Sequence, residues 1–125
     1  MTPLPLWLQR AMLATAAMNL MGALTFTPWG RPIRALGELP DGAPPVYLWI
    51  IAIFVLLFGV AYLVMGLTGR GDPLLIAIAA AGKLSFFALL AVFWLAGGLT
   101  IKAPLSAVGD LVFGALFLIW LAAPR

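Results

Sequence analysis

The chain has 125 residues, of which 65% are hydrophobic and only 9% are charged, whereas soluble domains carry roughly 25% charged residues. A chain this short covers only about two-thirds of its unfolded surface on folding, so seven basic and four acidic side chains cannot keep the remainder in water. The composition excludes an ordinary water-soluble globule and predicts an integral membrane protein.

The residue types that are missing exclude several kinds of chemistry. The sequence holds no cysteine and no histidine, which removes disulfides, thiol nucleophiles, His-dependent catalytic dyads and the usual zinc and haem ligands. The net charge of +3 is carried by scattered basic residues, so no nucleic-acid surface is predicted. No metal site is predicted either, and the lipid bilayer is the expected partner.

Four apolar runs are each long enough to cross a bilayer, which takes about 20 residues per helix. They cover residues 4–26, 46–68, 73–99 and 103–122, and each begins or ends at a charge, a proline or a glycine. We therefore predict an all-α fold, an antiparallel bundle of four transmembrane helices that forms a single domain over residues 1–125.

The connections between the second, third and fourth runs are short. Residues 69–72 read Gly-Arg-Gly-Asp before Pro73, which is typical of a tight turn followed by a helix start. Residues 100–102 form a similarly short link. Each pair of runs is therefore expected to pack as antiparallel neighbours.

The connection over residues 27–45 is the longest and contains five prolines. Within it, residues 32–39 place Ile33 and Leu36 on one side of a short helix and Arg34 and Glu38 on another. This pattern is typical of a helix that lies in the membrane interface.

Membrane orientation follows less directly from the sequence. Tryptophan and tyrosine gather near both ends of the four runs, as expected at the two membrane surfaces. Three basic residues fall on each side, so the positive-inside rule gives a tie. We expect both termini in the cytoplasm of a bacterial inner membrane. A secretory signal over the first run is the alternative interpretation of that segment.

Two charged residues lie too deep in the runs to reach water. At 1.5 Å per helical residue, Lys83 is about 15 Å from the side that holds the termini and Asp110 is about 20 Å from it. Asn19, at about 22 Å, lies at a similar level. Ionisable groups at such depth require a partner. We predict a Lys83–Asp110 ion pair in a buried polar site that Asn19 joins.

Three further residues are candidate contributors to this site. Thr15 shares a helical face with Asn19, and Tyr62 is the conspicuous polar residue of the second run, although closer to the membrane surface. Arg10 falls on the opposite face from Asn19 and at a depth from which its side chain can reach the headgroups. The alternative role for Arg10 is a clamp on an anionic lipid headgroup or substrate.

Each buried feature has more than one interpretation. Lys83 and Asp110 form a structural pair that specifies helix docking, or a proton-linked or ligand-binding site, or they are solvated separately. Ala52, Gly59 and Gly66 recur at heptad spacing, which is typical of close helix packing within the bundle or between protomers.

The layout of the chain resembles that of the DoxX-like superfamily of small bacterial four-helix membrane proteins. The resemblance lies in Asn19 and Gly22 of the first run, Arg34-Ala35-Leu36-Gly37 in the loop, Gly59 and Tyr62 of the second run, and Gly82-Lys83 of the third. It implies a quinone as a cofactor and a link to redox complexes. The lack of cysteine removes any thiol-based version of that chemistry, and no catalytic residue carries over.

Three functions fit these observations. The first is a noncatalytic accessory protein, or one that binds an amphipathic small molecule, with no cofactor and no enzymatic activity. The second is a small proton-coupled transporter that works as a homodimer through Asp110, although small multidrug transporters place their essential acid in the first helix, where this chain has Arg10 and Asn19. The third is a quinone-linked redox subunit of a larger membrane complex, with Lys83, Asp110 and Tyr62 around a lipid-soluble substrate.

Overall fold

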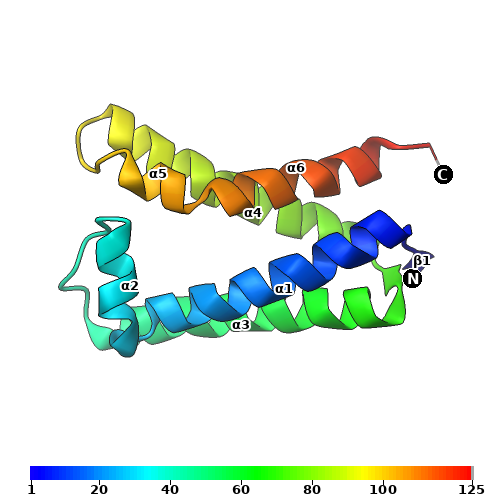
Figure 1. The fold of residues 1–125 in the computed structure, drawn as a ribbon, viewed down its shortest axis with the longest axis horizontal. Coiled ribbons are helices and arrows are strands. Elements are labelled where there is room, and N and C mark those ends of the chain that lie inside the picture. Colours follow the sequence, from blue (N-terminus) through cyan, green and yellow to red (C-terminus); the bar gives the residue numbers. More distant parts are fainter. Residues whose placement is uncertain (125) are drawn as a thin grey trace.

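The computed structural model describes residues 1–124 and is mostly helical (Figure 1). The four longer helices are α1 (Leu6–Phe26), α3 (Pro45–Thr68), α4 (Pro73–Leu95) and α6 (Val108–Ala122). The shorter elements are a 3-10 turn (Pro28–Gly30), the helices α2 (Arg31–Leu36) and α5 (Lys102–Ser106), and the strands β1 (Thr2–Pro3) and β2 (Arg70–Gly71).

Two helices, α3 and α4, are long and apolar enough to cross a membrane. The helix α6 is also apolar but has only 15 residues, and α1 is less apolar because Gln9, Arg10 and Asn19 interrupt its 21 residues. The predicted helical class is confirmed, together with two membrane-capable helices. The complete four-span bundle stays a prediction.

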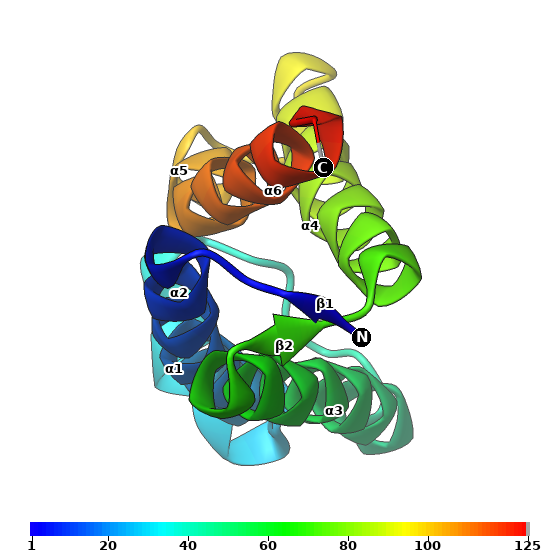
Figure 2. The same ribbon diagram turned by 90° about the vertical axis from the view of Figure 1, so that its right-hand side faces the viewer.

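The long helices form two pairs. The helix α1 packs along α3, α4 packs along α6, and the pairs meet where α1 contacts α6 (Figures 1 and 2). Glycines on α3 permit the first contact: a Cβ on Gly59 would lie 3.0 Å from the Cβ of Asn19, and one on Gly66 would lie 2.7 Å from Cδ2 of Leu13. These glycines therefore pack inside the molecule.

The expectation that the second and third runs pack as neighbours is wrong. The helices α3 and α4 run antiparallel, but α3 packs along α1 instead of α4 (Figure 2). The turn between them is occupied by the N-terminal segment, since Thr2 pairs with Gly71 and the Leu4 N–H donates to the Gly69 carbonyl at 2.8 Å. This segment buries Leu4 between the two pairs and holds α3 and α4 apart.

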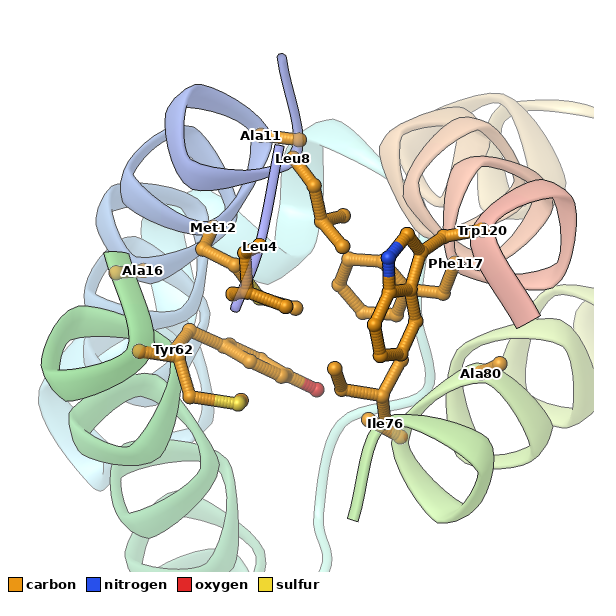
Figure 3. Packing of buried hydrophobic residues seen from close by; sticks show 12 residues of the cluster. Leu4, Leu8, Ala11, Met12, Ala16, Tyr62, Ile76, Ala80, Phe117 and Trp120 are labelled. Carbon is orange, nitrogen blue, oxygen red and sulfur yellow. The ribbon is translucent and has the colours of Figure 1, made fainter. Parts of the chain in front are cut away.

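The larger of two hydrophobic clusters lies at the end of the molecule that holds the termini, and a smaller one around Leu90, Ala103 and Ala107 lies toward the opposite end. Leu8 and Met12 from α1 meet Tyr62 from α3 and Phe117 and Trp120 from α6 (Figure 3). The rings of Tyr62 and Phe117 are 5.8 Å apart between centroids. Toward the opposite end, the two pairs diverge on either side of α2 (Figure 1).

The loop between α1 and α3 contains a short helix, α2, as predicted, and Arg34 of this helix is buried instead of reaching the surface. Its guanidinium donates to the carbonyls of Thr25 at 2.9 Å and Thr27 at 2.6 Å. Leu36 is 77% exposed, which is compatible with an apolar side chain that faces the membrane interface. The carbonyls at the C-terminus of α1 have no partners within that helix, and their attraction for the cation accounts for the burial of Arg34.

The last two runs are shorter than predicted. The third helix ends at Leu95, ahead of the expected residue 99, and Gly97 adopts a left-handed φ of +84° in the turn that follows. The fourth run is broken at Ala107 into α5 and α6. Beside the break, the Ser106 hydroxyl donates to the Ala103 carbonyl at 2.6 Å, a local bond that competes with continuous helix.

Candidate functional site

The predicted ion pair is present in the centre of the molecule. Lys83 of α4 places Nζ 3.3 Å from Oδ1 of Asp110 of α6. The side chain of Lys83 is only 5% exposed, whereas that of Asp110 is 22% exposed. Gly114 permits this approach, because a Cβ there would lie 2.8 Å from Leu84 Cγ and 3.5 Å from Lys83 Cβ.

Asn19 completes the polar group and connects it to the other helix pair. Its Oδ1 accepts a hydrogen bond from Lys83 Nζ at 3.2 Å, and its Nδ2 donates to the Val55 carbonyl of α3 at 2.9 Å. The amide is therefore held from both sides. One ammonium group thus joins α1, α4 and α6, and the amide extends the connection to α3.

Aromatic rings surround the same ammonium. Lys83 Nζ lies 5.1 Å from the ring centroid of Tyr62 and 5.9 Å from that of Phe113, within the range of cation–π attraction. The depth estimate put Tyr62 nearer the membrane surface, but its buried ring reaches the ion pair. Phe113 was not identified from the sequence, although it follows Asp110 by three residues and so shares its helical face.

The break at Ala107 places Asp110 near a helix N-terminus, which stabilises the negative charge of its carboxylate; a continuous helix would not do so. Asp110 occupies the first turn of α6, where the unpaired N–H groups and the helix dipole favour a negative charge. Gly109 keeps this turn close to α1, because a Cβ there would lie 2.5 Å from Sδ of Met18. The sequence signals for this arrangement were Pro104 and Gly109.

The two remaining candidate residues do not join the polar group. The Thr15 side chain is fully buried one turn from Asn19, and its hydroxyl has no hydrogen-bond partner among residues 1–124. Arg10 is exposed on the outer face of α1, away from Lys83 and Asp110. This position fits the interpretation in which its side chain reaches out to the membrane surface.

A cavity of about 450 Å³ adjoins the polar group. Asn19, Tyr62, Lys83 and Asp110 line one part of it. The rest of its wall is mostly apolar and is formed by side chains that include Met18, Met21, Phe26, Ile51, Phe54, Val55, Phe58, Ile78 and Phe86. The volume falls within the range of roughly 300–1,000 Å³ that is typical of small-molecule sites.

The arrangement has the chemistry of a recognition site. Lys83 has three N–H donors, and the structure uses two of them on Asn19 and Asp110. Asp110 uses Oδ1 in the pair, and its Oδ2 accepts no hydrogen bond from the residues that the structure describes. The polar group can therefore offer a bound molecule one donor and one acceptor beside apolar walls.

Comparisons with models of protein families, with curated proteins and with solved structures gave no match.

Proposed function

We propose that the protein is a four-helix membrane bundle that binds an amphipathic small molecule in this cavity and does not transform it. The observation that carries the proposal is the combination of apolar walls with a charged, hydrogen-bonding group at one side, Lys83 with Asp110. Such a combination suits a ligand with an apolar body and a polar head.

The apolar outer surface of the bundle supports a location in the lipid bilayer. Large apolar side chains are exposed along α3, α4 and α6, including Phe54, Leu57, Leu89 and Ile119. Contiguous exposed apolar surface of this extent marks a membrane or protein contact. In the proposed arrangement the bundle lies in the inner membrane of a bacterium, with both termini in the cytoplasm and α2 at the opposite surface.

A binding role is favoured over catalysis because Lys83 and Asp110 are paired with each other and positioned by neighbouring groups, and only one donor and one acceptor are left for a ligand. Asn19, Asp110 and two aromatic rings hold the Lys83 side chain in position. A fixed and neutralised pair positions a ligand well, since its dipoles need no rearrangement on binding.

Native mass spectrometry of gently extracted membranes tests the proposal. The wild-type protein is expected to retain a bound small molecule, and the double variant Lys83→Met/Asp110→Leu is expected to lose it. Leu57→Ala is the matched control, because Leu57 is exposed and does not line the cavity. A wild-type protein that carries no small molecule under these conditions, or equal retention by the double variant, would contradict the proposal.

A second candidate function is proton-coupled exchange by a dimer through Asp110. It is favoured by one observation: Asp110 lines the cavity, and its side chain is 22% exposed despite the pairing with Lys83. A carboxylate that faces a cavity can bind a proton and a cationic substrate in turn, and so exchange one for the other. Substrate flux in liposomes that is driven by a proton gradient and abolished by Asp110→Asn would establish this function, and unchanged flux would exclude it.

A further inference from the structure

Two contacts between the helix pairs narrow the cavity near α1 and α5. Phe26 of α1 and Phe86 of α4 meet edge to face, with ring centroids 6.2 Å apart. At the end near α2, Gly37 lies against Ser106, such that a Cβ on Gly37 would be 3.2 Å from the Ser106 hydroxyl. Contacts between the helix pairs therefore limit access from these directions.

The side between α3 and α4 is different. These helices do not pack along one another, and a cavity residue on each of them is exposed on the outer surface: Phe54 is 60% exposed and Ile78 is 51% exposed. Met21 of α1 also lines the cavity and is 56% exposed, but α1 packs along α3. The side chains of Phe54 and Ile78 are both apolar. The cavity thus opens sideways through an apolar rim, toward the region that lipid occupies in the proposed function.

Gly82 marks this opening. It lines the cavity from α4, and a Cβ built on it meets nothing within 4 Å. The neighbouring glycines of the bundle differ, since Gly59 and Gly114 have side-chain atoms within 3.0 Å of such a Cβ. Gly82 therefore leaves space at the opening and is not required by helix packing.

The charges of the cavity limit the ligand. Lys83 and Asp110 are the only charged residues that line it within the described part of the chain, and they neutralise each other. Arg34, the other buried cation among the described residues, donates to the carbonyls of Thr25 and Thr27. A charged ligand would leave an unbalanced charge in an apolar site, which is costly.

We propose that the ligand is an uncharged amphiphile with a hydroxyl head group and that it enters from the lipid between α3 and α4, past Gly82. This inference rests on the proposed function. A hydroxyl can accept from the third N–H of Lys83 and donate to Oδ2 of Asp110 at once. A neutral lipid with such a head is soluble in the bilayer and matches the apolar opening.

Three photoreactive lipids with the same diazirine chain test the ligand class in proteoliposomes. They are a monoacylglycerol, the corresponding fatty acid, and the corresponding alkyl trimethylammonium, and crosslinks are mapped by peptide mass spectrometry. The monoacylglycerol is expected to label cavity residues such as Phe58 and Phe86, and the charged probes only the outer surface. Preferential cavity labelling by a charged probe would overturn the ligand class and leave the proposed function standing.

The substitution Gly82→Phe tests the route. It is expected to lower cavity labelling by the monoacylglycerol about tenfold, whereas Ala81→Phe, at an exposed neighbour that does not line the cavity, is expected to leave it unchanged. Far-UV circular dichroism confirms that both variants are folded. Labelling that Gly82→Phe does not reduce would overturn access between α3 and α4. A wild-type cavity that no probe labels would count against the proposed function itself.

Discussion

Removing one partner of the central ion pair is expected to be more harmful than removing both. The single substitutions are Lys83→Met and Asp110→Leu, which replace each charged side chain with an apolar one of similar size. The double variant carries both. In each single variant a charge loses its counterion inside the bundle, and such a loss costs about 3–5 kcal/mol when the remaining charge is fully buried.

The structure makes the two single losses unequal. Asp110→Leu leaves the ammonium of Lys83, which is 5% exposed, without an anion, so we expect a loss of about 3 kcal/mol. Lys83→Met leaves a carboxylate that is 22% exposed and lies in the first turn of α6, so we expect about 2 kcal/mol. The double variant is expected to lose only about 1–2 kcal/mol, mainly because Asn19 loses its donor.

Unfolding of the purified protein in mixed micelles, driven by sodium dodecyl sulfate and followed by circular dichroism, measures all four free energies. The expected interaction energy between the two sites is about 3–4 kcal/mol. Leu57→Ala on the outer surface is the control, because it removes apolar side-chain atoms without touching the ion pair. Additive losses in the double variant would refute the pairing, and equal losses in the two single variants would refute the argument from exposure.

Three further substitutions test other contacts. Arg34→Met is expected to lower the free energy of unfolding by about 1.5–3 kcal/mol, because the two carbonyls at the end of α1 lose a charged donor, and thermal unfolding in detergent measures it. Gly59→Val is expected to cost about 1–3 kcal/mol in the same assay through overpacking against Asn19. At the surface, a hydrogen bond and the positive charge from Lys102 lower the pKa of Glu38 below its ordinary value. A lowered pKa stabilises the contact above the pKa of the unfolded chain, and this stabilisation is lost as the pH falls through the folded value. Spin-label distances between α2 and α5 should therefore widen in acid, and Lys102→Met should remove this pH dependence.

Apolar run length and depth were enough to predict the helices and the central contact. Bilayer-length runs gave the four long helices within a few residues at most ends, and a rise of 1.5 Å per residue put Lys83 and Asp110 at adjacent levels. Charge makes this inference strong, since an ion deep in an apolar run has few partners available.

The arrangement of the helices could not be derived in the same way. An apolar side chain fits lipid and protein equally well, so the sequence does not tell which faces of α3 and α4 meet. The pairing of Thr2 with Gly71 depends on backbone hydrogen bonds that no side-chain pattern reveals. The break at Ala107 and the burial of Arg34 likewise arise from local backbone groups that need partners.

The cavity also depends on these unforeseen features. It lies between two helix pairs that the N-terminal segment holds apart, so a bundle with α3 packed on α4 would have had less space for it. The sequence could name the polar residues of the site, but the apolar walls became visible only once the divergence of the pairs was known.

The uneven packing of the two ends has a mechanical consequence. Close-packed protein interiors are nearly incompressible, whereas hydrostatic pressure acts against internal voids. The packed side chains around Tyr62 and Phe117 should therefore resist compression, whereas the side chains around the 450 Å³ cavity have room to move. A ligand that fills the cavity would restrict these side chains and make this part of the molecule more rigid.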